Sequence, residues 1–147
     1  MARYAEQGVL AVSRDRLWEF LELHVDDASI TKIHPDVRGQ TTRSHEGDSY
    51  VVERSILFRR KLVPSVWKIS YHKPDFARWE ILESSAGPMA PGSFLENRYS
   101  DDPGGTLVST EGELTVVGFP KFFQRRVVRF AINHIDDQDV AYLAAHP

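Results

Sequence analysis

The sequence has 147 residues, 41% hydrophobic and 27% charged, which suits one domain built around one core. Its net charge of −3 argues against bulk nucleic-acid binding, because neutralising phosphates requires a dominant positive field. The absence of cysteine excludes disulfides, thiolate catalysis and cysteine-ligated zinc or iron–sulfur sites.

Targeting and membrane segments are not expected. Residues 1–6 (MARYAE) contain no apolar run of signal-peptide length. No stretch approaches the roughly 18 consecutive apolar residues that cross a bilayer. We therefore expect a single domain over residues 1–147, located in the cytoplasm, with no integral membrane segment.

The first part of the chain predicts a strand followed by two helices. Residues 4–12 end in the apolar run VLAV, which is typical of a strand. Ser13 is suited to cap a helix, and apolar residues then recur at helical spacing over residues 17–24. A second, short helix is expected over about residues 27–33. It ends before Pro35, because the residue that precedes a proline leaves the helical region.

From residue 37 to residue 118 the pattern predicts strands separated by turns. Pro64 indicates a sheet edge or a bulge, because proline cannot donate to a strand ladder. The expected strands cover residues 37–45, 48–58, 66–72, 77–83, 93–100 and 106–117.

Two hairpins have a register that the sequence can specify. A turn at 102–105 pairs Tyr99 with Val108 and Asn97 with Thr110, and places the charged residues together on the other face. In the preceding hairpin one face carries Trp67, Ile69, Tyr71, Trp79 and Ile81.

After Gly118 the hydrophobic period becomes helical. Pro120 suits a first helical position, and the helix is expected to continue to about Ala145. The stripe that we expect to face the sheet consists of Phe123, Val127, Phe130 and His134.

This order of elements resembles the START and birch-pollen-allergen superfamily, which includes polyketide cyclases, coenzyme-Q-binding proteins and lipid-transfer domains. The local sequences that carry the resemblance are residues 11–13 (AVS), 16–21 (RLWEFL), 33–37 (IHPDV) and 104–111 (GGTLVSTE). The resemblance covers nearly the whole chain. It implies an α+β helix-grip fold, in which a curved antiparallel sheet surrounds a long C-terminal α-helix, with two short helices after the first strand. It also implies an apolar ligand cavity, but no shared catalytic motif.

The expected faces together define a candidate cavity lining. Its members are Arg54, Trp67, Tyr71, Trp79, Asn97, Tyr99, Thr110, Phe123, Val127, Phe130 and His134. The tyrosines, Asn97 and Thr110 either orient a ligand or complete the core and the cross-strand pairs. Arg54 faces inward in one register, where it can bind a carboxylate or phosphate; a slip of one residue places Glu53 inside instead.

Histidines provide the other candidate chemistry. His134 is either a polar or acid–base group in the cavity, or a residue near the exposed end of its helix. His24, Asp26, Asp27 and His34 have no known metal-ligand spacing, and we interpret them as solvated loop residues. No metal and no cofactor are therefore expected.

The function predicted first is binding or transport of a hydrophobic small molecule, such as a lipid, an isoprenoid or a polyketide-like aromatic. The second hypothesis is a cyclase or dehydratase, in which His134, Tyr71 or Arg54 moves protons or polarises a carbonyl. The third is a transient protein-interaction module with an incidental cavity, whose outer sheet face or basic patch binds a partner. That patch would join residues 59–61 to Arg125, Arg126 and Arg129.

Overall fold

A computed structural model describes residues 2–84 and 89–146, arranged as seven strands and three helices within those ranges. The expected loop residues Gly87 and Pro88 lie outside the described residues. In chain order the elements are β1 (Ala2–Leu10), α1 (Arg14–Leu23), α2 (Ile30–Ile33), β2 (Val37–Glu46), β3 (Ser49–Phe58), β4 (Lys61–His72), β5 (Phe76–Ser84), β6 (Phe94–Asp102), β7 (Gly105–Leu114) and α3 (Lys121–Ala145).

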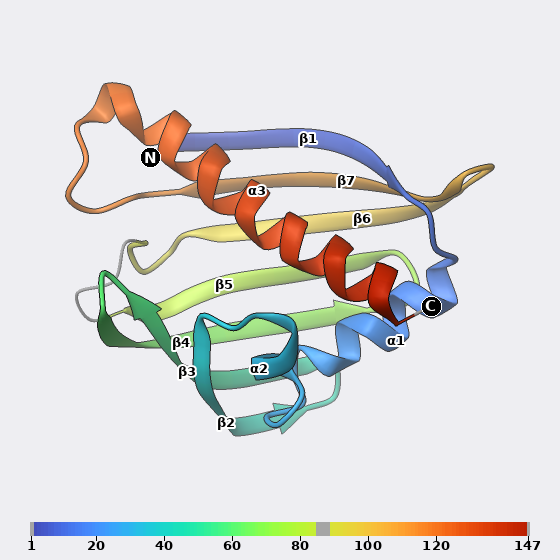
Figure 1. The fold of residues 1–147 in the computed structure, drawn as a ribbon, viewed down its shortest axis with the longest axis horizontal. Helices are drawn as coiled ribbons and strands as arrows, with labels where there is room; N and C mark the ends of the chain where they lie inside the picture. The colour runs from blue at the N-terminus through green and yellow to red at the C-terminus, as the bar shows by residue number, and fades with distance from the viewer. Residues whose placement is uncertain (1, 85–88, 147) are drawn as a thin grey trace.

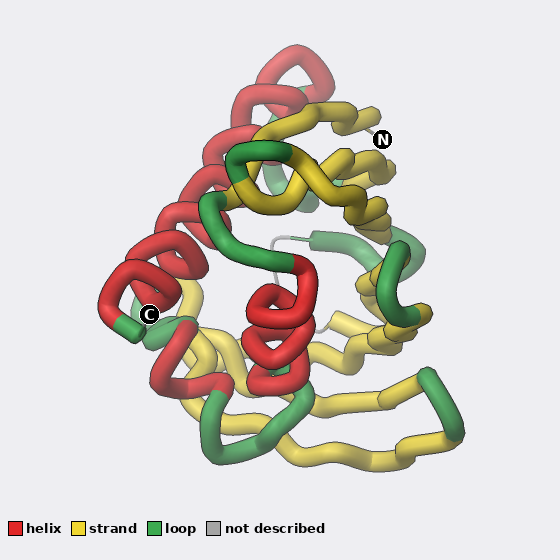
Figure 2. Tube along the Cα trace, turned by 90° about the vertical axis from the view of Figure 1, so that its right-hand side faces the viewer, coloured by secondary structure: helices red, strands yellow, loops and turns green. Residues whose placement is uncertain are grey.

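The strands form one antiparallel sheet in the order β1-β7-β6-β5-β4-β3-β2. The first strand pairs with the last, so β1 forms one edge of the sheet, next to β7, and β2 forms the other edge. The sheet curves around the helices (Figure 2), and α3 crosses its concave face diagonally, with α1 and α2 on the same side (Figure 1). This is the α+β architecture that the sequence predicts.

The helix α1 begins where the sequence expects it. The Ser13 hydroxyl accepts a hydrogen bond from the backbone N–H of Arg16 at 3.2 Å, which satisfies one of the free donors of the first turn. Leu17, Phe20 and Leu21 lie on the buried face of α1 and join the main hydrophobic core. This packing places the C-terminal end of α1, at His24, against the concave side of the sheet.

The predicted hairpin registers are confirmed. Tyr99 pairs with Val108 and Asn97 pairs with Thr110 between β6 and β7. The β4–β5 ladder pairs Trp67 with Ile81 and Ile69 with Trp79, so their side chains share the concave face. Pro64 lies just before the described β4–β5 ladder, which begins at Ser65 and contains an irregularity between Val66 and Trp67.

The register of β3 decides whether the side chain of Arg54 or that of Glu53 faces the concave side of the sheet. Val52 is fully buried and Arg54 is 8% exposed, so both face the concave side. Glu53 faces away and pairs with Arg43 of β2, with Arg43 Nη2 and Glu53 Oε2 separated by 2.9 Å. The inward alternative for Arg54 is therefore the one that the fold adopts.

The predicted orientation of α3 is wrong. Phe130 is 76% exposed and Phe123 is 43% exposed, whereas Val128 and Ile132 are buried against β1 and β7. Gln124 lies on the same side of the helix as Val128 and Ile132, and its Nε2 donates to the backbone oxygen of Val116 at 2.9 Å, which is consistent with that side facing the sheet. Apolar residues recur on two faces of α3, one aromatic and one aliphatic, and the aliphatic face packs against the sheet.

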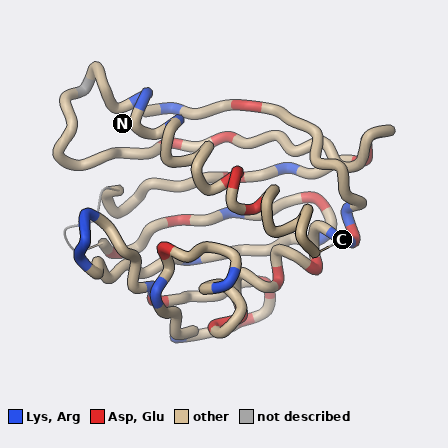
Figure 3. The backbone as a smooth tube through the Cα atoms, viewed as in Figure 1, with Lys and Arg blue, Asp and Glu red and all other residues tan. Residues whose placement is uncertain are grey.

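The charges along α3 oppose its dipole. Basic residues, including Arg125, Arg126 and Arg129, lie in its first half, and Asp136, Asp137 and Asp139 follow (Figure 3). Cations near a helix N-terminus and anions toward its C-terminus are not favourable, so these charges do not stabilise α3, whose buried face packs on β1 and β7. No helix within the described ranges is long and apolar enough to cross a membrane.

Candidate functional site

The concave face brings together most of the lining that the sequence predicts. Strands β3 to β7 contribute its members Arg54, Trp67, Tyr71, Trp79, Asn97, Tyr99 and Thr110. Tyr71 and Tyr99 are buried, whereas Trp67, Trp79, Asn97 and Thr110 are half-buried. The face is thus closed near the tyrosines and partly open along the tryptophan, asparagine and threonine positions.

Hydrogen bonds already join several of these polar groups. Thr110 Oγ1 donates to Asn97 Oδ1 at 2.7 Å, and Asn97 Nδ2 donates to the Tyr99 hydroxyl at 3.2 Å. The Tyr71 hydroxyl donates to the backbone oxygen of Leu21 at 2.8 Å. The cross-strand and core roles of these residues are therefore present.

The two buried tyrosines enclose an aromatic cluster with Trp18 of α1. Trp18 makes edge-to-face contacts with both Tyr71 and Tyr99, with ring centroids 5.5 Å apart in each pair. Burial is the main cause that raises the pKa of each phenol well above its ordinary value. Both hydroxyls stay protonated at neutral pH, so neither is a ready general base.

Arg54 is the most unusual member of the concave face. Its Nε donates to Gln40 Oε1 at 2.6 Å and its Nη2 donates to the backbone oxygen of His24 at 3.1 Å. Its guanidinium carbon lies 5.5 Å from the centre of the Trp67 ring, which places the cation over an aromatic face. Two neutral acceptors and one aromatic ring therefore hold this side chain.

The charge of Arg54 lacks an anionic counterpart among the described residues. Burial lowers the pKa of the guanidinium below its ordinary value, to about 10, so the group is still charged at neutral pH. Its Nη1 has no hydrogen-bond partner in residues 2–84 and 89–146. Every fully buried side-chain nitrogen or oxygen in those ranges does have a partner, so Nη1 is not fully buried. Nη1 therefore borders accessible space.

His134 does not reach this face. It is half exposed on α3, where its Nε2 is 3.1 Å from Oδ2 of Asp36, a residue that follows α2. Because α3 is rotated relative to the predicted stripe, Phe130 also points to solvent. Val127 and Phe123 lie at the side of the helix, half-buried and exposed respectively. The predicted convergence of His134 with Tyr71 and Arg54 is wrong.

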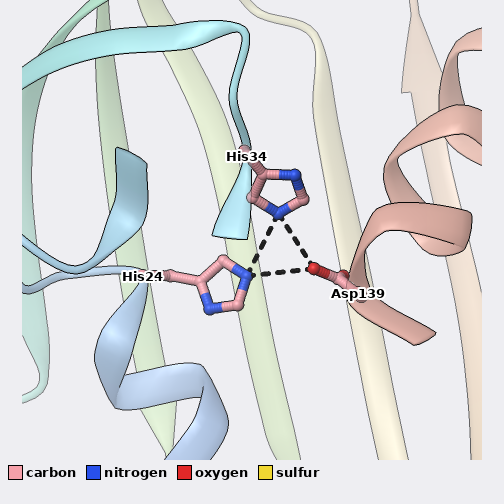
Figure 4. Close-up of side chains that lie close together, drawn as sticks. All are labelled: His24, His34 and Asp139. Carbon is pink, nitrogen blue, oxygen red and sulfur yellow. Dashed lines mark hydrogen bonds and ion pairs between the residues drawn. The ribbon is translucent and has the colours of Figure 1, made fainter. Parts of the chain in front are cut away.

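A second group of side chains meets where the three helices come together. His24 ends α1, His34 ends α2, and Asp139 projects from α3 toward both rings (Figure 4). His24 Nε2 lies 3.3 Å from His34 Nε2 and 3.3 Å from Asp139 Oδ1, and His34 Nε2 lies 2.9 Å from Asp139 Oδ1. One atom of each residue therefore points at a common centre, as metal ligands do.

The interpretation of His24 and His34 as solvated loop residues is wrong, because both are buried. Asp26 and Asp27 are exposed, as expected. The sequence carried one signal for the cluster. Asp139 lies seven residues after Ile132 and four before Leu143, so a carboxylate occupies the buried row of α3.

The pKa of Asp139 is lowered from its ordinary value. Burial, the largest single influence, would raise the pKa, but the hydrogen bonds and charge interactions with His24 and His34 outweigh it. The carboxylate is therefore ionised at neutral pH.

A small cavity lies elsewhere, between the start of β1 and the first half of α3. Its volume is about 130 Å³, and Arg3, Tyr4, Arg125, Val128 and Arg129 are among its lining residues. Sites for drug-sized ligands measure about 300–1,000 Å³. This cavity is therefore too small for a lipid or an aromatic polyketide.

Comparisons with known proteins identify the architecture. No family model matches the sequence, and no curated protein matches it. Among solved structures, Ara h 8.0201 has a TM-score of 0.79 at 12% identity, over 99% of each chain. A START superfamily protein from Mycobacterium smegmatis has a TM-score of 0.78 at 9% identity, also over 99% of each chain. The chain has the helix-grip fold.

A third helix-grip structure, the Zhui aromatase/cyclase from Streptomyces sp. R1128, has a TM-score of 0.69 at 12% identity. It is matched over 95% of this chain and 89% of its own. The resemblance to the START and birch-pollen-allergen superfamily is thus confirmed for the fold. At such low identities the helix-grip likeness does not transfer a function, because one fold hosts many functions.

Proposed function

We propose that this chain binds an apolar small molecule that carries an anionic group, against the half-buried residues of the concave face beside Arg54. The observation that carries the proposal is Arg54, a buried cation held by neutral acceptors. Burying a charge without a counter-charge is expensive. A carboxylate, phosphate or phenolate on the ligand would supply that counter-charge and accept a hydrogen bond from Nη1.

The apolar part of the ligand would contact the half-buried aromatic residues of the concave face. Trp67 lies beside the guanidinium, and Trp79 is the next large side chain along the same face. Aromatic walls with a single polar anchor are typical of small-molecule sites. A lipid, an isoprenoid or a polyketide-like aromatic with an acidic group has this chemistry, and transport of such a molecule requires no further catalytic residue.

A cyclase or dehydratase is a weaker proposal for this chain. Acid–base catalysis of that kind needs two groups within reach of one substrate. Tyr71 already donates to a backbone oxygen, and His134 is half exposed on α3 with Asp36 as its partner. Arg54 alone can polarise a carbonyl but cannot accept a proton at neutral pH.

The proposal can be tested with two fluorescent probes of similar size. Anilinonaphthalene sulfonate is apolar and anionic, whereas phenylnaphthylamine is apolar and uncharged. Arg54→Met keeps the aliphatic volume and removes the cation. We expect this variant to bind the anionic probe at least about tenfold more weakly, which corresponds to about 1.4 kcal/mol, and to bind the neutral probe with little change.

Arg43→Met is the matched control, because Arg43 lies on the neighbouring strand β2 and is about half exposed. It should change neither affinity. Circular dichroism verifies that both variants are folded. Two results would contradict the role assigned to Arg54. In one, Arg54→Met loses affinity for both probes equally; in the other, both variants lose affinity for the anionic probe equally.

A further inference from the structure

We propose that His24, His34 and Asp139 bind a divalent transition-metal ion at the junction of α1, α2 and α3. The proposal is independent of the ligand function of Arg54. It rests on the spacing of three ligand atoms, on the hydrogen-bond partners of the two imidazole rings and on the burial of the cluster.

The spacing fits a coordination polyhedron. A bond of about 2.0–2.1 Å from zinc to nitrogen or oxygen places two ligand atoms about 2.9 Å apart at a right angle and about 3.3 Å apart at the tetrahedral angle. The three distances in the cluster are 3.3, 3.3 and 2.9 Å. A single ion can therefore contact all three atoms without a change in the backbone.

In both histidines Nδ1 already has a hydrogen-bond partner, which leaves Nε2 to coordinate a metal ion. His24 Nδ1 lies 3.1 Å from the backbone oxygen of Phe20, and His34 Nδ1 lies 2.7 Å from Gln138 Oε1. A carbonyl oxygen can only accept, so each ring carries its hydrogen on Nδ1. With the hydrogen on Nδ1, Nε2 of each ring is the nitrogen that faces the other ring and Asp139, and it is the atom that a metal ion would take; without an ion, a proton held there donates to Asp139.

Three electron-pair donors within 3.3 Å repel one another unless a positive charge lies between them. The repulsion is strong here, because the side chains of His24 and His34 are 8% and 10% exposed, and that of Asp139 is 26% exposed. A metal ion removes this repulsion, and carbonyl groups behind metal-bound imidazoles are the usual support for such ligands. A proton shared within the cluster is the competing occupant, and the experiment below separates the two.

The ligand set selects the class of ion. Two imidazoles and one carboxylate favour zinc, iron(II) or cobalt(II) over magnesium and calcium, which prefer oxygen ligands. Three protein ligands leave at least one position for water or for an oxygen atom of a small molecule, as in open rather than closed metal sites. The partly exposed Asp139 marks the side from which that oxygen would approach.

The experiment uses the full chain after removal of metal with a chelator. We expect zinc chloride to bind with one equivalent per chain in calorimetry and to raise the melting temperature. Asp139→Asn keeps the shape and removes the charge, and we expect at least about tenfold weaker zinc binding. His72→Asn is the matched control, because the half-exposed His72 also pairs with an aspartate, with Nδ1 3.6 Å from Asp48 Oδ2, but lies outside the cluster; its zinc affinity should be unchanged.

A measurement on the unmodified chain covers the case in which Asp139→Asn does not fold. Cobalt(II) shifts the proton resonances of coordinated imidazoles far outside their normal range. We expect two shifted, exchangeable N–H signals, one from each Nδ1. The absence of saturable binding by one equivalent, fewer than two such signals, or full zinc affinity in folded Asp139→Asn would overturn the proposal and favour the shared proton.

Discussion

Arg54 Nη2 donates a hydrogen bond to the backbone oxygen of His24 at 3.1 Å, so the proposed ligand anchor and a proposed metal ligand meet at one backbone group. The side chain of His24 faces Asp139 and His34, while its carbonyl faces the guanidinium. The two proposed sites are therefore adjacent, and the charge of one should influence the other.

The first prediction concerns that coupling. A divalent ion at His24 adds positive charge beside Arg54, so zinc should strengthen binding of anilinonaphthalene sulfonate by about threefold or more and leave phenylnaphthylamine unchanged. Because linkage is reciprocal, the anionic probe should strengthen zinc binding by the same factor. Fluorescence titrations with and without zinc measure the first factor, and calorimetry measures the second. An affinity for the anionic probe that zinc leaves unchanged, or an equal gain for the neutral probe, would contradict direct coupling at this junction.

The second prediction tests the orientation of α3. Phe130 is exposed and Ile132 is buried, although they are two residues apart. Phe130→Ser should change the free energy of unfolding by less than about 0.5 kcal/mol, since it alters a solvated side chain. Ile132→Ala should cost about 2–4 kcal/mol, because it removes buried methyl groups and leaves a cavity. Urea unfolding measures both values, and the reverse order would show that the phenylalanine face packs.

The sequence predicts the pairing of the strands, but it does not predict which face of α3 packs on the sheet. Strand pairing was predictable because alternation fixes which side chains share a face, and a slip would expose Trp67 and Tyr71 together. On α3 two apolar rows compete, one with Phe123 and Phe130 and one with Val128 and Ile132. The choice depends on contacts with residues far away in the sequence, since Val128 and Ile132 pack with Tyr4 of β1 and Leu114 of β7, and no local pattern encodes those contacts.

One part of the candidate site could be predicted from the sequence, and the other part could not. Arg54 was a candidate because its inward position depends on one strand register, which burial of Val52 then specifies. The cluster of His24, His34 and Asp139 was missed because its members come from three helices. Their meeting depends on how α3 packs on the ends of α1 and α2, and the spacing in sequence carries no metal-ligand pattern.

The third prediction concerns a close approach of two strands. A Cβ atom at Gly112 would lie 2.2 Å from the backbone oxygen of Phe94, whereas a Cβ atom at Gly8 would meet nothing within 4 Å. Gly112→Ala should therefore cost about 2 kcal/mol or more, because backbone must move. Gly8→Ala, on the strand paired with β7, should be neutral or stabilise by up to about 1 kcal/mol. Equal effects in thermal unfolding would contradict the close approach of β6 to β7 at Gly112.

The fourth prediction concerns alkaline pH. Burial raises the pKa of Tyr4 to about 12, and it raises the pKa values of Tyr71 and Tyr99 further above the ordinary value of about 10. The unfolded chain releases these protons first, so the stability that the neutral phenols contribute is fully present below pH 10. It decreases as the pH rises above about 10, and the contribution of Tyr4 is lost through about pH 12.

Urea unfolding at a series of pH values measures this slope. Each such tyrosine contributes up to about 1.4 kcal/mol per pH unit between its two pKa values. The double variant Tyr71→Phe, Tyr99→Phe should show a shallower decrease than the unmodified chain, whatever its stability at neutral pH. Parallel slopes in the two proteins would mean that the phenols ionise without unfolding.

The central claim is that an anionic apolar ligand enters the concave face and contacts Arg54. Nuclear magnetic resonance of side-chain N–H groups, recorded while anilinonaphthalene sulfonate is added, tests it directly. The account predicts that the signals of Arg54 Nε and Trp67 Nε1 move together and saturate at one equivalent, while the signal of Arg43 Nε does not move. Unchanged Arg54 and Trp67 signals, with changes instead in the backbone of α3 around the exposed Phe130, would place the probe on the outer surface and contradict the claim.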